Sequence, residues 1–249
     1  MSDTHLMNLR DLGGLPLTNG GQTRSGVLYR GDAPYPGDVV PDNVFTWPPA
    51  MVIDLRSAEE SDRVGYTWPK GPVVQRHALH DAAAPTQELP DTLAEVYLAM
   101  VRTTPHRIAA TIGMVARSDG PVFVHCALGK DRTGVVVAAL LLAADVTPEA
   151  VVADYLDTET NLAALRNRLR TRVPRGPTAP GRRINKAFLE VTEDGIRGVV
   201  RELTAWPGGP RAWLTDHGAA HTDIDVWRKR FAGTVVPSTE RPAHARSTM

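Results

Sequence analysis

The sequence has a single cysteine, no excess of either charge and no long apolar run. One cysteine excludes an intramolecular disulfide, which fits a reducing compartment. The chain has 28 Lys and Arg residues and 28 Asp and Glu residues. Its net charge therefore creates no electrostatic field that would favour binding to nucleic acid or an anionic membrane. The longest apolar run, around residues 134–144, is too short to span a bilayer. The first residues lack the basic and apolar regions of a secretory signal peptide. We therefore expect a cytoplasmic protein with no stable membrane insertion and no nucleic-acid partner.

Short strand candidates alternate with helical patterns along the 249 residues, which suffice for one full hydrophobic core. This alternation predicts an α/β fold with a mostly parallel central sheet flanked by helices. We expect a single domain over 1–232 and, because the end is polar and aperiodic, a disordered tail over 233–249. The strand candidates are 26–31, 50–56, 72–79 and 121–125. After the second of these, Ser57 and Glu60 have the spacing of a capping box that starts a short helix. Helical patterns cover 91–117 with a break near 103–105, then 147–156, 184–204, 209–216 and 222–232.

Residues 125–134, His-Cys-Ala-Leu-Gly-Lys-Asp-Arg-Thr-Gly, join the last strand candidate to a buried helix candidate. A loop in this position turns successive backbone N–H groups toward one point in front of the helix N-terminus, where a phosphate fits. Cys126 would lose its proton easily there, because cationic neighbours and the helix end favour the thiolate. Arg132 lies six residues later and can give two parallel hydrogen bonds to two phosphoryl oxygens. The loop can therefore hold a phosphate and attack it.

Four other interpretations compete with a phosphate-attacking cysteine. A lone cysteine at a strand end is usually an inert, buried side chain. A metal phosphohydrolase could use His77, His80 and Asp81, but residues three apart on a strand face opposite sides. A thiol relay on Cys126 would need a second cysteine, and a catalytically silent phosphate-binding module would usually lack the cysteine or Arg132.

The Cys-x5-Arg pattern resembles that of the protein tyrosine phosphatase superfamily, and further segments are similar to the bacterial tyrosine phosphatases typified by mycobacterial tyrosine phosphatase B. These segments are Asn-Leu-Arg-Asp-Leu-Gly-Gly at 8–14, Leu-Tyr-Arg-Gly at 28–31, Ile-Asp-Leu-Arg-Ser at 53–57 and Asp-Tyr-Leu at 154–156. The resemblance covers roughly 8–230. It implies a tyrosine/dual-specificity phosphatase-like fold with a helical lid region at about 157–205.

Each loop residue has an expected role. Cys126 attacks phosphorus and forms a cysteinyl-phosphate. Arg132 and the loop stabilise the equatorial phosphoryl oxygens. Thr133 donates a hydrogen bond to the thiolate and His125 orients the loop. No metal or cofactor is expected. The expected phosphate-binding residues are Ala127, Leu128, Gly129, Lys130, Asp131 and Arg132.

The general acid that protonates the leaving group has two candidates. Asp131 lies inside the loop, where related phosphatases with Lys-Asp-Arg are proposed to use that aspartate. Asp81 ends the preceding strand candidate, at the kind of position where other superfamily members keep their acid. We favour Asp131. Either aspartate could instead have a structural role in a turn or helix cap.

Charged residues around the loop have a structural interpretation, since buried charges must be paired. We expect ion pairs rather than substrate contacts from Arg10, Asp11, Arg30, Asp54 and Arg56, and a core position for Tyr155.

A basic stretch without acidic residues separates Glu159 from Glu190. It is either a solvated helix face followed by a flexible loop, or a cationic lid that selects a substrate with a second anionic group. The candidate lid residues are Arg172, Arg175, Arg182 and Arg183. The substrate itself stays open between a phosphoprotein, a phosphoinositide and a small phosphorylated metabolite. Lipid-active relatives have two lysines in the loop, whereas this loop has one.

Overall fold

A five-stranded, mostly parallel sheet forms the centre of the protein in this computed structural model, which describes residues 4–79, 90–172 and 190–233. The strand order is β1-β2-β5-β3-β4, and only the first pair is antiparallel. The predicted α/β class is confirmed. The bounds are β1 (Arg10–Asp11), β2 (Leu28–Gly31), β3 (Met51–Asp54), β4 (Val73–Arg76) and β5 (Val122–His125).

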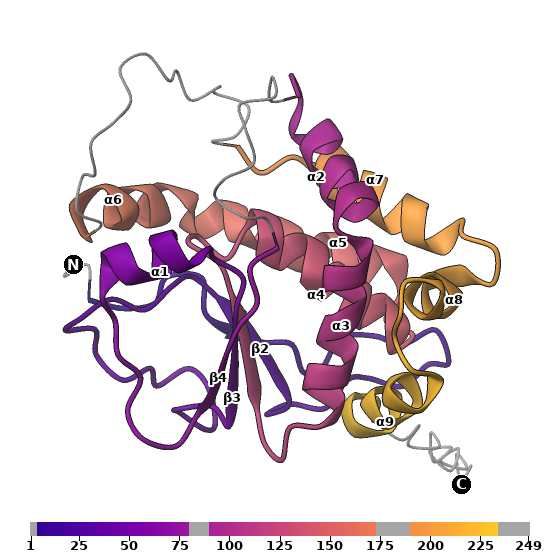
Figure 1. The fold of residues 1–249 in the computed structure, drawn as a ribbon, viewed down its shortest axis with the longest axis horizontal. Helices are drawn as coiled ribbons and strands as arrows, with labels where there is room; N and C mark the ends of the chain where they lie inside the picture. Colours follow the sequence, from indigo (N-terminus) through magenta and orange to yellow (C-terminus); the bar gives the residue numbers. More distant parts are fainter. Residues whose placement is uncertain (1–3, 80–89, 173–189, 234–249) are drawn as a thin grey trace, which may run out of the picture.

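Helices flank this sheet, with α8 and α9 at the opposite end of the molecule from α1 and α6 (Figure 1). Their bounds are α1 (Ala58–Val64), α2 (Leu93–Thr103), α3 (Pro105–Ala116), α4 (Asp131–Ala143), α5 (Pro148–Leu156), the 3₁₀ helix η1 (Asp157–Asn161), α6 (Leu162–Arg172), α7 (Glu193–Thr204), α8 (Gly209–Asp216) and α9 (His221–Phe231).

Local sequence signals explain several of these boundaries. Ser57 and Glu60 form a reciprocal capping box at the start of α1. Thr147 caps α5 with Pro148 in the first turn, and Pro105 starts α3 directly after α2 ends. The sequence predicts a helix over 184–204. In the described residues this helix, α7, begins only at Glu193, after Thr192.

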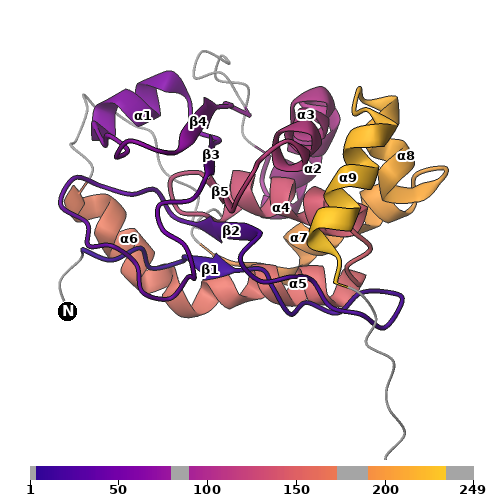
Figure 2. The ribbon, with the colours of Figure 1, turned by 90° about the horizontal axis from the view of Figure 1, so that it is seen from below.

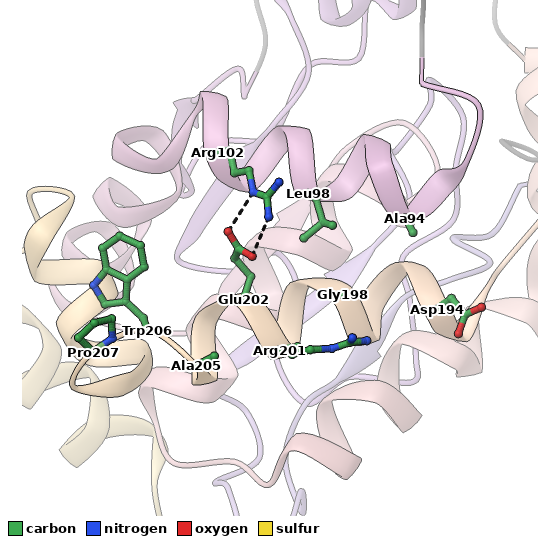
Figure 3. A pocket seen from close by; sticks show the side chains of 10 residues that line it. All are labelled: Ala94, Leu98, Arg102, Asp194, Gly198, Arg201, Glu202, Ala205, Trp206 and Pro207. Atoms are coloured by element: carbon green, nitrogen blue, oxygen red, sulfur yellow. Dashed lines mark hydrogen bonds and ion pairs between the residues drawn. The ribbon is translucent and has the colours of Figure 1, made fainter.

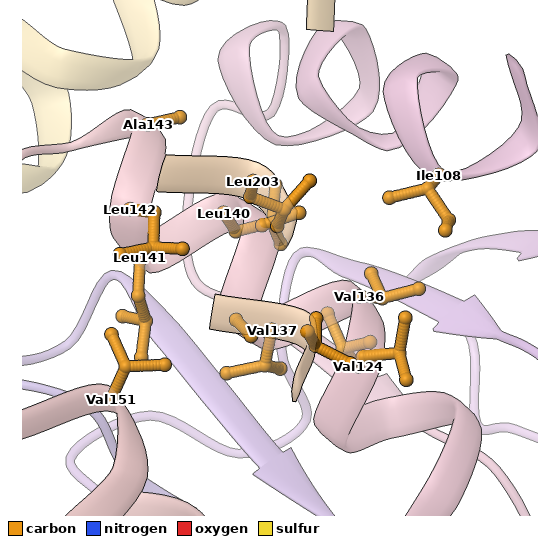
Figure 4. Packing of buried hydrophobic residues seen from close by; sticks show 14 of the residues in the cluster. Ile108, Val124, Val136, Val137, Leu140, Leu141, Leu142, Ala143, Val151 and Leu203 are labelled. Atoms are coloured by element: carbon orange, nitrogen blue, oxygen red, sulfur yellow. The ribbon is translucent and has the colours of Figure 1, made fainter. Parts of the chain in front are cut away.

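The main core surrounds α4, whose residues from Thr133 to Ala143 are all buried. A helix that is apolar all round must be covered on every side, and α2, α3, α5, α7 and α8 all pack against it. Figure 4 shows the result, with Val136 and Leu140 among side chains from β5, α3, α5 and α7. This packing fixes the N-terminus of α4 at the carboxyl end of β5, where the Cys-x5-Arg loop lies.

Loop residues, rather than a second set of helices, fill the smaller cluster on the other face of the sheet. Tyr29, Val52 and Phe123 are fully buried there, and Trp47 and Trp68 pack against them. Figure 2 shows α3, α4, α8 and α9 together on one side of the strands. No helix in the described residues combines the length and apolarity that a membrane crossing requires.

Candidate active site

The Cys-x5-Arg loop turns its carbonyl groups toward donors in the surrounding protein. Asn8 Nδ2 lies 3.2 Å from both the Leu128 and Gly129 oxygens, and the Ala33 N–H donates to Ala127 O at 3.1 Å. His125 Nδ1 lies 3.1 Å from the Cys126 oxygen.

Because a trans peptide points each carbonyl away from the following N–H, the N–H groups of residues 127–130 face the inside of the loop. The hydrogen bonds found among the described residues make no use of the N–H groups of residues 127–129. These amides form a concave set of donors in front of α4, which is an anion-binding arrangement.

Gly129 lets the loop approach β2 closely. Its φ is +68°, and a Cβ there would lie 2.2 Å from the Gly31 carbonyl oxygen. Both the backbone conformation and the space therefore require glycine. Gly134, one turn into α4, has a similar role, since its Cβ would come within 2.9 Å of the Tyr155 ring.

A buried ion-pair cluster supports the loop from the side of β1 and β2. Asp154 accepts from Arg10 Nε at 2.8 Å and from Arg30 Nη1 at 2.5 Å, while Arg30 Nη2 donates to Gly129 O at 2.8 Å. Burial raises the pKa of Asp154, but the charges of Arg30 and Arg10 outweigh it, so the pKa lies below its usual range. Arg10 and Arg30 have the structural pairing that the sequence predicts, and their shared partner Asp154 was not foreseen.

Arg132, in the first turn of α4, is held by a carboxylate from another element. Its Nη1 and Nη2 donate to Glu60 Oε2 at 2.6 Å and Oε1 at 2.8 Å. Oε2 also accepts from the Ser57 N–H at 2.9 Å, so the capping residue of α1 is also the partner of Arg132. Burial raises the pKa of Glu60, but the Arg132 hydrogen bonds more than compensate and place it below its ordinary value. Cys126, six residues before Arg132, is 2 % exposed.

His125 is completely buried at the end of β5, and burial lowers its pKa to about 4, so the ring is neutral at pH 7. Its Nδ1 lies 3.9 Å from Asp54 Oδ1, and Asp54 is paired with Arg56 at 2.7 Å. Burial raises the pKa of Asp54, but the charges of His125 and Arg56 and the Arg56 hydrogen bonds together lower it far below its ordinary value. Thr133 Oγ1 is buried with no hydrogen-bond partner in the described part of the chain.

Lys130 and Asp131 face each other at the start of α4. Lys130 is completely buried, with Nζ 2.8 Å from the Glu190 carbonyl oxygen and 3.2 Å from Asp131 Oδ1. The same Oδ1 accepts a 2.6 Å hydrogen bond from the hydroxyl of Tyr97, which the sequence did not single out. Tyr155 is buried, as expected, and its hydroxyl lies 2.8 Å from that of Tyr97.

The other candidate residues from the sequence lie elsewhere or outside the described residues. Arg172 Nη2 donates to Pro36 O at 2.6 Å and is 3.3 Å from Asp38 Oδ1. His77 Nε2 lies 2.7 Å from the Arg107 carbonyl oxygen. The tail after 233 is not described, and the candidate residues outside the described ranges are His80, Asp81, Arg175, Arg182 and Arg183.

Arg168, expected on a solvated face or in a lid, is buried in α6. It forms ion pairs with Asp32 and Asp38 and stacks 4.5 Å from the centre of the Tyr35 ring. These contacts attach α6 to the segment that follows β2.

A separate groove of about 630 Å³ runs between α2 and α7. Figure 3 shows Arg102 of α2 reaching across to Glu202 of α7, with both hydrogen bonds at 3.0 Å. None of the Cys-x5-Arg loop residues lines this groove. The groove is therefore separate from the candidate active site.

The sequence profile described as "Tyrosine phosphatase family" matches residues 2–233. A Cupriavidus necator protein that carries a tyrosine-protein phosphatase name is 27% identical over 238 residues, which cover 91% of this chain and 86% of that protein. Triple specificity protein phosphatase PtpB of Mycobacterium tuberculosis is 28% identical over 137 residues, 51% of this chain and 48% of its own length. A tyrosine-protein phosphatase of Nostoc commune is 36% identical over 198 residues, which cover 72% of this chain and 65% of that protein.

Proposed function

The chain belongs to the tyrosine phosphatase family, and on that premise we propose that it hydrolyses phosphomonoesters through a cysteinyl-phosphate on Cys126. The activity class, phosphoric monoester hydrolase, is that of the family and of its named relatives. The observation that carries the mechanism is the outward hydrogen bonding of the loop carbonyls, from which we infer that the loop N–H groups point to the opposite side, in front of α4.

In the first step the Cys126 thiolate attacks phosphorus and the S–P bond forms. The bond from phosphorus to the ester oxygen breaks, and its electron pair stays on the leaving oxygen. The inward N–H groups of residues 127–130 and the Arg132 guanidinium stabilise the equatorial oxygens. Glu60 holds the guanidinium plane in place before substrate arrives, so the two-pronged donor is preorganised.

The leaving oxygen takes a proton from Asp131, which yields the free alcohol or phenol. Water then attacks the cysteinyl-phosphate, the S–P bond breaks with its electron pair returning to sulfur, and the Asp131 carboxylate takes the proton of the attacking water. The net reaction is phosphomonoester plus water giving alcohol plus inorganic phosphate. Asp81 is the alternative acid, and it lies outside the described residues.

Two features keep the thiolate charged in this proposal. The N-terminus of α4 and the cationic Arg132 and Lys130 favour the anion. The Thr133 hydroxyl is buried beside the loop without another partner in the described part of the chain, so it can donate to sulfur.

Family members act on phosphorylated substrates, and we propose phosphotyrosine as the first substrate to test. A phosphoinositide or a small phosphorylated metabolite remains the alternative. The loop has one lysine, Lys130, and this residue is buried against Glu190 and Asp131, which leaves little exposed charge for a polyphosphorylated headgroup.

The test uses Cys126→Ser and Arg132→Lys with an aryl phosphate. We expect Cys126→Ser to lose turnover while still binding inorganic phosphate, because a serine hydroxyl stays protonated. Arg132→Lys should lose roughly 100-fold or more in rate, because an ammonium cannot make two parallel bonds. The matched control is Arg63→Lys, an exposed arginine of α1 paired with Glu59. Full turnover by Cys126→Ser, or loss of activity with a chelator alone, would refute the mechanism.

A further inference from the structure

Tyr97 places a hydroxyl on the aspartate proposed as general acid. Its Oη donates to Asp131 Oδ1 at 2.6 Å, from a ring that is completely buried in α2. We propose that Tyr97 is a positioning residue for general acid catalysis, which fixes the carboxyl group of Asp131 so that its other oxygen carries the proton. This inference rests on the proposed function of Asp131.

The hydroxyl of Tyr97 is a permanent donor. Burial and the negative charge of Asp131 raise its pKa well above the ordinary value of 10.0, so it stays protonated throughout the working range of a phosphatase. The hydroxyl of Tyr155 lies 2.8 Å away, and the two rings meet edge to face at 5.9 Å. The edge-to-face contact between the rings holds Tyr97 in one orientation, and this contact is kept when Tyr155 loses only its hydroxyl.

A second donor lies within hydrogen-bonding distance of the same Asp131 oxygen. Lys130 Nζ is 3.2 Å from Oδ1 and is itself held by the Glu190 carbonyl oxygen. Oδ1 thus accepts from a phenol and an ammonium group, whereas Oδ2 takes part in none of the hydrogen bonds seen among the described residues. A carboxylic acid whose Oδ1 accepts two donors carries its proton on Oδ2. The side chain is 31% exposed, so Oδ2–H can reach a substrate.

The elements around Asp131 keep this arrangement stable. α2 carries Tyr97, and its outer face is joined to α7 by the Arg102–Glu202 pair. The groups that act on Asp131 include the donors Tyr97 and Lys130 and the charge of Arg132, which itself interacts with Glu60 and Cys126. Of these groups, Tyr97 alone is a neutral donor to the carboxylate, so its removal leaves the formal charge of the site unchanged.

The experiment measures kcat/KM, which reports formation of the cysteinyl-phosphate, for an alkyl phosphate and for an aryl phosphate with an acidic phenol. It then takes the ratio of the two values within each variant. This ratio does not depend on the fraction of folded enzyme. Tyr97→Phe should lower the alkyl rate by about tenfold and the aryl rate by less than about threefold, because a good leaving group needs no proton. Tyr155→Phe is the matched control, since its hydroxyl contacts Tyr97 but not Asp131, and we expect its ratio to stay within about twofold of the parent.

A double mutant separates a positioning role from a structural one. In the Asp131→Asn background, Tyr97→Phe should change the ratio no further, because the acid it serves is gone. An unchanged ratio in Tyr97→Phe, beside a strong shift in Asp131→Asn, would overturn this inference alone. A further shift on top of Asp131→Asn would also overturn it. No shift in Asp131→Asn itself would overturn the proposed acid and this inference with it.

Discussion

Arg132 and Glu60 share two parallel hydrogen bonds, of 2.6 and 2.8 Å, across 72 residues of sequence. The same carboxylate closes the capping box with Ser57 at the start of α1. The guanidinium that we propose to bind the phosphoryl group is therefore oriented by the carboxylate that also caps α1.

Glu60→Gln tests this connection. The amide can accept only one of the two Arg132 bonds, so the guanidinium loses its fixed plane. We expect kcat/KM for an aryl phosphate to fall by roughly 100-fold, since small misplacements of a catalytic group cost that much. Glu59→Gln is the control, because this neighbour is exposed and pairs only with Arg63 in the described structure. Similar losses in both variants would mean that α1 stability, rather than Arg132 orientation, is affected.

Asn8→Ala tests how the loop carbonyls are held. The change removes the donor to the Leu128 and Gly129 oxygens. We expect inorganic phosphate to bind about tenfold more weakly, because the facing N–H groups lose their preorganisation. Asn43→Ala removes a comparable bond to the Leu9 oxygen, away from the loop, and should leave phosphate affinity nearly unchanged. Titration of each protein with phosphate measures the difference, and equal affinities would contradict the prediction.

Gly129→Ala tests the close approach of the loop to β2. Its Cβ would meet the Gly31 oxygen at 2.2 Å, so the loop must shift and turnover should fall by at least about 100-fold. Gly14→Ala is the matched control, since Gly14 also has a positive φ but open space around its Cβ position. Gly14→Ala should cost about 1 kcal/mol of stability and no activity. Activity of Gly129→Ala near that of the parent would show that the loop tolerates the shift.

His125 links stability to pH. Burial lowers its pKa from the ordinary 6.5 to about 4, so the unfolded chain binds more protons than the folded protein between these values. The stability contributed by the neutral ring is complete above pH 6.5 and is lost as the pH falls toward 4.

His125→Asn removes this contribution and keeps a donor for the Cys126 carbonyl. The difference in unfolding free energy between parent and variant should shrink by about 2 kcal/mol from about pH 7 to pH 5. Burial raises the pKa of Asp32 to about 6, so this group makes the protein more stable as the pH falls. This contribution is the same in parent and variant and cancels in the difference. Denaturant unfolding at the two pH values measures the difference, and a constant value would show that His125 does not titrate as stated.

Sequence patterns predicted the features that depend on neighbours along the chain. The apolar run of β5, the loop and the apolar α4 were expected together, because a buried strand and a buried helix are each recognisable locally. The break before Pro105 and the Ser57–Glu60 capping box were also predicted from adjacent residues.

Tertiary partners could not be predicted in the same way. Glu60 was recognised as a cap, yet nothing local indicates that its carboxylate reaches Arg132. Tyr97 has the spacing of an ordinary core residue of α2, and only the packing of α2 on α4 brings it to Asp131. Arg168 belongs to a basic run that indicates a solvated face, but the acidic residues after β2 bury it.

The most direct test of the account is acid quenching of the enzyme during turnover of an aryl phosphate, followed by mass spectrometry of the peptide that contains residues 125–134. The chain has one cysteine, so a thiol-linked phosphoryl group can have only one position. We predict a phosphoryl group on Cys126 in the parent, more of it in a variant slowed in hydrolysis such as Asp131→Asn, and none in Cys126→Ser. A parent enzyme that turns over without any phosphoryl group on Cys126, or with one on another residue, would contradict the account.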